Sequence, residues 1–232
     1  MTTLSTATAI TLVRKNLDEA GLNDSIMYTD ENNDNLSLDD IIKKNLPEAI
    51  NAVHLFAPVS LLEGESYQFR TSGSRPGGET MSISADGVLT FSPSTDSGFL
   101  RLVAFQASDS PIVVTDALKE ASPEGRKQLN QYVRGRFDRP RLVRKQGDMT
   151  PPVFKYYTLK EETVASSASN PMRAVASFMF VKEQIYSASA TSYKISRLLR
   201  QNIIDWLTGM VLEIYSDQRA NTFLEKAKSF AE

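Results

Sequence analysis

Hydrophobic positions near the N-terminus recur at three- and four-residue spacing, which is typical of amphipathic helices. Ser5 and Thr6 can cap a first helix, and Gly21 is placed to end it. One face of this predicted helix carries four apolar residues, namely Ile10, Val13, Leu17 and Ala20. We therefore expect the first helix to lie between these two boundary residues.

A second hydrophobic stripe follows a polar segment. Ser37 and Asp40 stand in the spacing of a capping box, with Asp in place of the usual Glu or Gln. The stripe consists of Ile41, Ile42, Leu46, Ile50, Val53 and Leu55. Pro47 falls inside it and must kink a helix or restart one in its first turn. We expect two consecutive helices here, which makes residues 1–57 a helical N-terminal region.

Residues 58–187 change to the alternating pattern of strands. The predicted strands are Ser66–Arg70, Met81–Ser84, Val88–Phe91, Phe99–Gln106, Val153–Leu159 and Val175–Val181. Asp86-Gly87 offers a tight turn between two of these strands. A short helix is predicted from Pro123 to Tyr132, because Ser122-Pro123-Glu124 is a favourable helix start.

Residues 188–232 return to helical spacing and predict a long C-terminal helix with at most one break. Its apolar residues are Ile195, Leu198, Leu199, Ile203, Trp206, Leu207, Met210, Val211 and Ile214. We expect Ile203, Trp206, Leu207 and Met210 to pack this helix. The whole pattern predicts an α+β protein with a helical N-terminal region, a strand-rich middle and a long C-terminal helix.

Composition narrows the chemistry that this chain can perform. The 232 residues include no Cys, which excludes disulfides, thiolate zinc sites and iron–sulfur clusters. A single histidine, His54, excludes metal sites built from several histidines. No targeting segment is recognisable, and no apolar run approaches the roughly 18 residues of a membrane span. We therefore expect a protein that resides or is assembled in a cytosol, without a membrane partner.

No motif provides a convincing catalytic or metal site. The segment Asp30–Asp34 resembles the start of a calcium loop, but Asn35 and Ile41 stand where an EF-hand needs Gly and Glu. No partner Ser or Asp stands at a recognisable spacing from His54, so a structural or surface histidine is favoured over a general base. The glycine-rich Ser72–Gly78 lacks the Gly-Lys-Ser/Thr ending of a phosphate loop. We predict no catalytic residue, no metal and no cofactor, with a weak cation site near Asp30–Asp34 left open.

The charges are distributed unevenly along the chain. Formal net charge is −2, but residues 126–145, the basic arm, carry eight basic residues against Asp138 alone, which leaves −9 for the remainder. Acids without a basic neighbour run from Asp18 through Asp40. The predicted contact residues of the basic arm are Arg134, Arg136, Arg139, Arg141, Arg144 and Lys145. The basic arm can bind nucleic-acid phosphates, dock on an acidic protein surface, or simply be solvated.

Three sequence stretches in this part of the chain resemble a known family. They read RLVAFQASD (Arg101–Asp109), SPEGRKQLNQYVRGRFDRPRLV (Ser122–Val143) and PVFKYYTL (Pro152–Leu159). In order and content these stretches resemble a neck protein of crAss-like bacteriophages. The resemblance implies a ring protein of the head–tail connector, usually in twelve copies below the portal. The strand-rich middle departs from common phage adaptors, which are mostly helical.

The favoured hypothesis is therefore a structural virion protein and not an enzyme. It forms a homo-oligomeric ring in the neck of a tailed phage, links the portal to other neck and tail proteins, and surrounds viral DNA that passes non-specifically. Such a protein is located in the virion after assembly in the cytoplasm of the bacterial host. One alternative is a nucleic-acid-binding module that uses Arg126–Lys145, and another is a hydrolase that acts through carboxylates.

Overall fold

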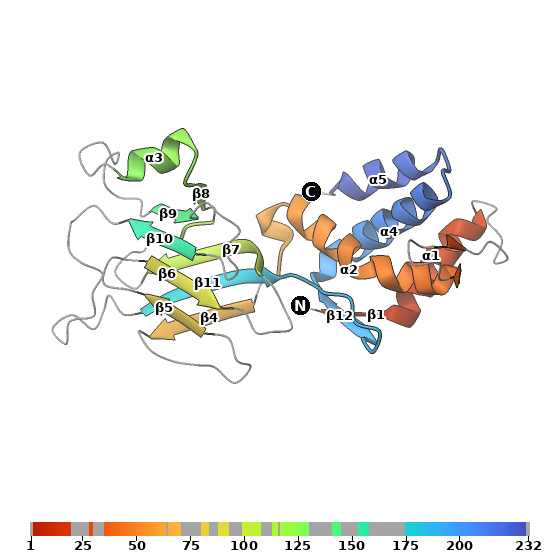
Figure 1. Cartoon of the computed structure of the whole chain (residues 1–232), viewed down its shortest axis with the longest axis horizontal. Coiled ribbons are helices and arrows are strands. Elements are labelled where there is room, and N and C mark those ends of the chain that lie inside the picture. The colour runs from red at the N-terminus through yellow and green to blue at the C-terminus, as the bar shows by residue number, and fades with distance from the viewer. Residues whose placement is uncertain are drawn as a thin grey trace. The chain divides into compact units, whose positions relative to one another are not determined.

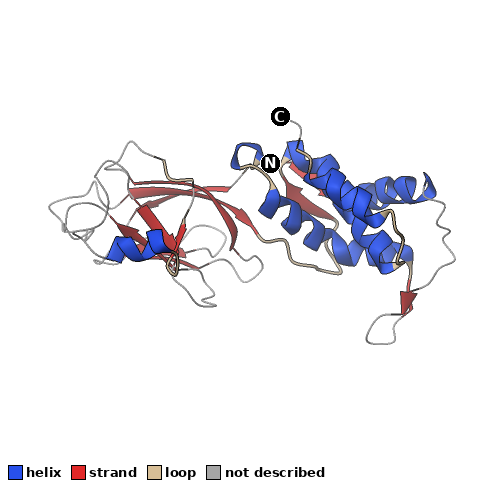
Figure 2. Cartoon of the chain, turned by 90° about the horizontal axis from the view of Figure 1, so that it is seen from above, coloured by secondary structure: helices blue, strands red, loops and turns tan. Residues whose placement is uncertain are grey.

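A computed structural model describes most of both chain ends and the strands of the middle. The described residues are 2–19, 28–29, 35–63, 65–70, 80–83, 88–92, 99–107, 113–115, 117–129, 141–144, 153–157 and 175–230. Along the chain, helices lie in both terminal regions and most strands lie in the middle, which confirms the α+β class (Figure 1). The chain divides into two compact units, a helical unit (Met1–Glu63 with Glu183–Glu232) and a sheet unit (Gly64–Lys182). Figure 2 shows helices dominating the first unit and strands the second.

The helical unit begins with the short strand β1 (Thr2–Ser5) and helix α1 (Thr6–Glu19). Ser5 caps α1 as predicted, because its Oγ accepts a hydrogen bond of 3.1 Å from the Thr8 backbone N–H. Val13 and Leu17 on the predicted face are fully buried. The predicted end of this helix at Gly21 lies outside the described residues.

Helix α2 (Leu38–Phe56) is a single helix of 19 residues, so the prediction of two consecutive helices is wrong. Its start is as predicted, since the Ser37 side chain accepts from the Asp40 backbone N–H at 3.3 Å. Pro47 is buried inside the helix, which continues because apolar side chains such as Leu46 and Ile50 are buried on both sides of it. The helix ends before Pro58, which favours extended backbone at Ala57 (ψ 143°).

The C-terminal region is not one long helix. It contains strand β12 (Ser192–Ile195), a 3₁₀ turn (Arg197–Leu199), helix α4 (Arg200–Ile214) and helix α5 (Ala220–Lys228). Strand β12 pairs antiparallel with β1, with Leu4 opposite Tyr193. Both of these side chains are buried, so pairing with a distant segment overrides the helical spacing of residues 192–195.

The break between α4 and α5 follows from the backbone at Ser216, which has a left-handed φ of 56°. The Asp217 N–H bonds to the Leu212 carbonyl at 3.0 Å, and the Ser216 N–H to the Glu213 carbonyl at 2.9 Å. These two bonds form a Schellman motif, which usually has Gly at the left-handed position. The anticipated single break therefore exists, and a serine forms it.

The sheet unit contains two sheets. Strands β5 (Thr80–Ile83), β6 (Val88–Ser92), β10 (Val153–Tyr157), β9 (Arg141–Arg144) and β8 (Leu118–Lys119) lie in the order β5-β6-β10-β9-β8. Strands β4 (Glu65–Arg70), β11 (Val175–Lys182) and β7 (Phe99–Ala107) form the second sheet, in the order β4-β11-β7. All neighbours are antiparallel except β8 and β9, which are parallel. The six predicted strands correspond to β4, β5, β6, β7, β10 and β11.

An aromatic cluster joins the two sheets. The Phe99 ring on β7 lies 5.4 Å from the Phe154 ring on β10 and 5.8 Å from the Phe180 ring on β11, between centroids. Phe154 and Phe180 are fully buried, so this cluster is part of the core of the sheet unit. Short strands β2 (Tyr28–Thr29) and β3 (Asn35–Leu36) form a separate antiparallel pair in the helical unit.

Candidate functional site

The four residues predicted to pack the C-terminal helix all lie on α4, but they differ in burial. Ile203 and Leu207 are completely buried in the helical unit. Trp206 and Met210 are only half-buried. Two of the four predicted packing residues therefore lie in the core, and the other two also reach the surface.

Trp206 belongs to an aromatic patch, which we define as Phe56, Trp206 and Lys228. The Phe56 and Trp206 ring centroids are 5.4 Å apart, and Phe56 is 54% exposed. Lys228 Nζ lies 5.6 Å from the Phe56 centroid and 5.5 Å from the Trp206 centroid. This geometry places a cation near two aromatic rings, one exposed and one half-buried, which is a cation–π arrangement.

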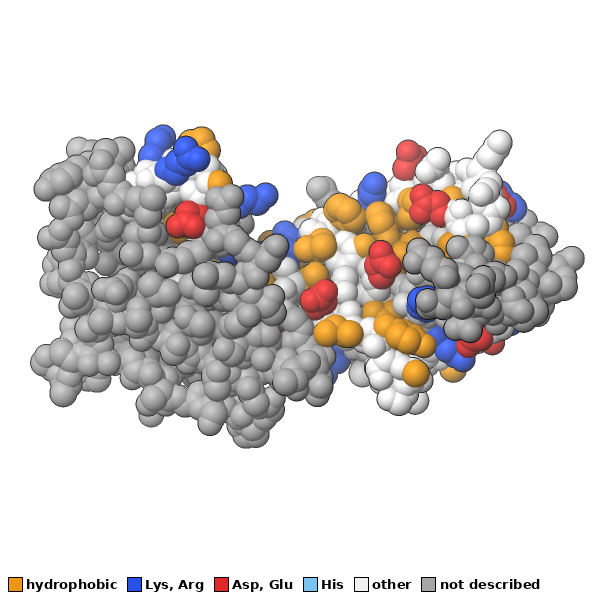
Figure 3. Space-filling view, viewed as in Figure 1, with side chains coloured by type: hydrophobic (Ala, Val, Ile, Leu, Met, Phe, Trp, Pro, Cys, Tyr) orange, Lys and Arg blue, Asp and Glu red, His pale blue; other side chains and the backbone are white. Residues whose placement is uncertain are grey.

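Other large apolar side chains are exposed on the same unit. Among the residues that the structure describes, six large hydrophobic side chains are exposed, and five of them belong to the helical unit: Leu55, Phe56, Ile185, Tyr186 and Leu198. Orange side chains reach the surface at several places over this unit in Figure 3. Leu55 and Leu198 belong to the predicted apolar stripes but are exposed in the structure. Phe56 was not predicted, although its place outside the apolar stripe of α2 could have identified it as a surface residue.

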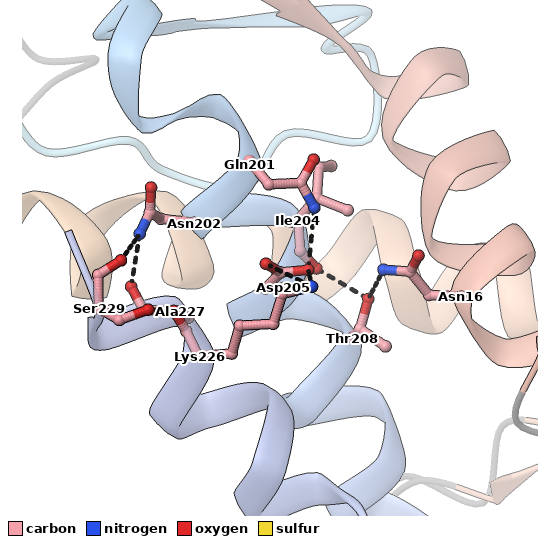
Figure 4. A network of polar contacts seen from close by, with 9 residues as sticks. All are labelled: Asn16, Gln201, Asn202, Ile204, Asp205, Thr208, Lys226, Ala227 and Ser229. Atoms are coloured by element: carbon pink, nitrogen blue, oxygen red, sulfur yellow. Dashed lines mark hydrogen bonds and ion pairs between the residues drawn. The ribbon is translucent and has the colours of Figure 1, made fainter. Parts of the chain in front are cut away.

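A polar network fixes α4 against α5 (Figure 4). The Asp205 side chain is 3% exposed and lies 3.3 Å from Lys226 Nζ of α5. Gln201 Nε2 donates to Asp205 Oδ1 at 3.0 Å. Asn202 Nδ2 donates to the carbonyl of Ala227 at 2.9 Å, at the end of α5. These contacts hold the end of α5, and with it Lys228, beside the start of α4.

The network continues on the other side of α4 through Thr208. Asn16 Nδ2 of α1 donates to Thr208 Oγ1 at 3.1 Å, and this hydroxyl donates to the Ile204 carbonyl at 2.8 Å. Farther along α4, a Cβ at Gly209 would lie 2.8 Å from Leu224 side-chain atoms. Gly209 therefore permits the close approach of α5, which explains a glycine inside a helix.

The helical unit consists of two chain segments, and side chains bind the backbone where the first segment ends at Glu63 and where the second begins near Gln184. Asn51 forms two bonds with the Gln184 backbone, since its Nδ2 donates to the carbonyl and its Oδ1 accepts from the N–H, both at 2.8 Å. The Ser196 hydroxyl accepts from the Glu63 N–H at 2.8 Å. Both anchors satisfy backbone groups through side chains, so residues 63 and 184 are held firmly within this unit.

The basic arm is only partly within the described residues. Its two ends are regular, because Arg126 and Lys127 lie on helix α3 (Pro123–Leu129) and Arg141 and Arg144 lie on strand β9. Arg134, Arg136, Arg139 and Lys145 lie outside the described residues. Arg144 is exposed, and its guanidinium carbon is 5.7 Å from the Phe99 ring centroid.

Helix α3 is fixed closely to the end of β8. The Ser122 hydroxyl donates to the Lys119 carbonyl at 2.7 Å and accepts from the Gly125 N–H at 3.0 Å. A Cβ on Gly125 would lie only 2.1 Å from the Lys119 carbonyl oxygen, so only glycine fits here. Exposed Arg126 and Lys127 follow directly after this contact.

We call the resulting surface the α3 basic face; it consists of Lys119, Arg126, Lys127 and Arg144, all exposed. Lys and Arg side chains gather there in Figure 3. Within the described part of the chain, neither Arg126 nor Lys127 forms an ion pair. Arg126 and Lys127 are thus exposed next to Glu124 of the same helix, which is exposed as well.

His54 is completely buried on α2. Burial lowers the pKa of its imidazole from 6.5 to about 4, because the charged form loses its solvation. His54 is consequently neutral at physiological pH. Of the two alternatives left open by the sequence, a structural or a surface histidine, this burial excludes the surface one.

The described residues contain no cluster of three or more His, Asp or Glu able to hold a metal ion. The candidate cation segment Asp30–Asp34 lies outside them. Among the described helices, none combines the length and apolar character needed to cross a bilayer.

Comparisons with known proteins assign no family to the chain. No family model matches it, and a search of curated proteins finds no match.

Proposed function

We propose that this protein is a structural subunit that forms an oligomeric ring in the head–tail connector of a tailed phage. In that role it would link the portal to the tail and surround the exiting DNA. The motifs of Arg101–Asp109, Ser122–Val143 and Pro152–Leu159, which resemble phage neck proteins, support this identity.

The observation that carries the proposal is the exposed apolar surface of the helical unit. Its core is already filled by completely buried side chains such as Leu46, Ile203 and Leu207. Phe56 and Leu198 nevertheless remain 54% and 65% exposed. Exposed aromatic and aliphatic side chains of this kind are often used in protein–protein contacts, in which buried aromatic residues supply much of the binding energy.

A ring requires a second, different surface on each subunit. Contacts within a ring are heterologous, so one face of each copy meets an unlike face of the next. The α3 basic face differs in chemistry from the aromatic patch and belongs to the other compact unit. Two unlike surfaces on one chain suit a ring subunit better than an isologous dimer.

The decisive experiment is cryo-electron microscopy of virions, combined with mass photometry of the purified protein. We expect a closed ring of this chain between portal and tail, and oligomers in solution at micromolar concentration. A protein that stays monomeric and is missing from virions would overturn the proposal. As a finer test, Phe56→Ser should weaken assembly, whereas Ser60→Ala, at an exposed position beyond the end of α2, should leave it unchanged.

The nucleic-acid-binding alternative draws on the α3 basic face. It predicts DNA or RNA binding whose affinity falls steeply with salt, because phosphate contacts release counterions. A ring subunit should bind free DNA weakly at physiological salt. Electrophoretic mobility shifts at two salt concentrations separate these functions.

A further inference from the structure

Helices α4 and α5 pack against each other through specific polar contacts (Figure 4). Asn202 Nδ2 donates to the carbonyls of Ala227 and Ser229, at 2.9 Å and 3.2 Å. The Asp205 side chain, which is 3% exposed, lies 3.3 Å from Lys226 Nζ. An α5 helix in another register would separate Asp205 from this cation, and a buried carboxylate without its partner is strongly unfavourable. The surface of α4 therefore accepts this helix in one register.

The connection between the two helices is strained. Residues Tyr215–Arg219 join α4 to α5, and Ser216 there has a φ of 56°, which is unfavourable for a residue with a side chain. An ion pair of 2.6 Å between Asp217 and Arg219 lies within the connection, but exposed pairs of this kind contribute little. The connection contains neither glycine nor proline, so its residues can also be helical.

The contacting faces of α4 and α5 lie on one line in the sequence. Their positions recur at steps of three and four residues from α4 through the connection into α5, which is the spacing of one helix face. If the connection is helical, the side of α4 that contacts α5 and the side of α5 that contacts α4 form one continuous stripe. The residues of this stripe are Asn202, Asp205, Gly209, Glu213, Ser216, Ala220, Leu224 and Ala227.

Contacting residues lie at nearly equal distances from Ser216 along the chain. Asn202 lies 14 residues before Ser216 and Ser229 lies 13 after it, whereas Gly209 lies 7 before and Leu224 lies 8 after. Two straight helices that run antiparallel, with their Ser216 residues side by side, therefore bring each α4 against the α5 of the other copy. The register is the one that the structure shows within a single copy.

We propose that α5 is exchanged between two copies of this chain, so that α5 of each copy packs on α4 of the other. The structure defines the occupant of this surface, because the same helix of the same chain fills it. Exchange of an identical element leads to a dimer without any new contact surface, and here it also releases the strain at Ser216. The contact is two-fold, goes beyond the proposed ring and does not depend on it.

Cross-linking between single cysteines tests the exchange, because the chain has no Cys of its own. Copies with Asn202→Cys and copies with Ser229→Cys are co-expressed with different tags and treated with a short bismaleimide. Without exchange these two positions lie side by side only within one copy, where Asn202 Nδ2 is 3.2 Å from the Ser229 carbonyl oxygen. We expect a product that joins the two chains. The matched control pairs Asn202→Cys with Glu48→Cys, at an exposed position of α2, and should give no such product.

Two substitutions at Ser216 should shift the exchange in opposite directions. Ser216→Ala favours a helical connection and keeps the strain of the turn, so it should strengthen the dimer at least about threefold. Ser216→Gly removes the strain and disfavours a helix, so it should weaken the dimer at least about tenfold. Each change acts once in each copy, so a dimer contains it twice. Sedimentation equilibrium over a series of concentrations gives the dissociation constant of each variant.

Two results would overturn this proposal. The first is a double variant Asn202→Cys/Ser229→Cys that cross-links only within single chains, together with no product between the co-expressed single variants. It would show that α5 stays on its own α4. The second is an equal dissociation constant for Ser216→Ala and Ser216→Gly, which would show that the connection does not open. Neither result refutes the proposed ring, which depends on the presence of the protein in virions.

Discussion

The dependence of stability on pH tests whether the chain's only histidine is buried. His54 is completely buried near the C-terminal end of α2, and burial lowers the pKa of its imidazole from 6.5 to about 4. A helix C-terminus favours a cation by about 0.3–1 kcal/mol at exposed sites, but loss of solvation acts in the opposite direction and dominates here. We predict that the protein loses stability as the pH falls from 6.5 towards 4.

The sign and the size follow from proton binding. Near pH 6.5 the unfolded chain begins to protonate this histidine, whereas the folded protein does so only near pH 4. The unfolded state therefore binds more protons in this interval, and the free energy of unfolding decreases as the pH falls. The pKa difference between 6.5 and about 4 corresponds to about 3 kcal/mol, at about 1.4 kcal/mol per unit. This contribution is fully present above pH 6.5.

Urea unfolding at a series of pH values between 7 and 4 measures the effect, with His54→Gln and His54→Leu as controls that cannot titrate. Subtracting the variant's pH dependence removes the contribution of carboxylates. Two carboxylates with lowered pKa values lose their stabilising effect mostly below this pH range. Hydrogen bonds from Arg219 lower the pKa of Asp217 to about 2, and the Ser37 hydroxyl lowers the pKa of Asp40. Because the chain has one histidine, a single imidazole resonance in a proton NMR titration reports the folded pKa directly.

Two results would refute the reasoning about His54. A folded-state imidazole pKa near 6.5 would mean that the side chain is solvated. A wild-type stability profile parallel to that of both variants between pH 6.5 and 4 would mean that this titration is not linked to folding.

Three further predictions concern backbone positions. Gly209→Ala should lower the free energy of unfolding by about 1–2 kcal/mol, although alanine has the higher helix propensity. The reason is that the new Cβ would lie 2.8 Å from the Leu224 side chain. In urea unfolding, adding Leu224→Ala to this variant should recover part of the loss. Gly125→Ala should lower the thermal midpoint of the sheet unit and cost about 2–3 kcal/mol, because the Cβ meets the Lys119 carbonyl oxygen at 2.1 Å; unchanged calorimetry would contradict this contact. Ser216→Gly should raise stability by about 0.5–1 kcal/mol, because its φ of 56° suits glycine, and a decrease in urea unfolding would contradict the assigned backbone.

Elements governed by local chemistry were predictable from the sequence. The caps at Ser5 and Ser37 form as expected, because each needs only a hydroxyl and a backbone N–H three residues later. The break after α4 was anticipated without its position, since Ser216 stands where a Schellman motif usually has glycine. Pro47 misled the prediction because burial on both sides of it outweighs a lost hydrogen bond.

Elements that depend on distant partners were not predictable. Strand β12 has helical spacing in the sequence and becomes a strand because Thr2–Ser5 pairs with it across almost the whole chain. The aromatic patch escaped prediction for the same reason. Phe56 and Lys228 are far apart in sequence and meet over Trp206 only because α5 folds back along α4.

The charge asymmetry of the chain acquires a different meaning once the fold is known. In the sequence it divides into a +7 basic arm and a −9 remainder, but that remainder is not one surface. Part of it neutralises the basic arm within the sheet unit, and the rest gives the helical unit its −6. Attraction between exposed charges is largely screened beyond about 10 Å at about 0.1 M salt, so the net charge of a unit can steer a partner towards it but cannot fix a contact. Specific contact requires cations held in place, and of the described basic arm Arg126 and Lys127 meet this condition, because α3 is fixed at the end of β8.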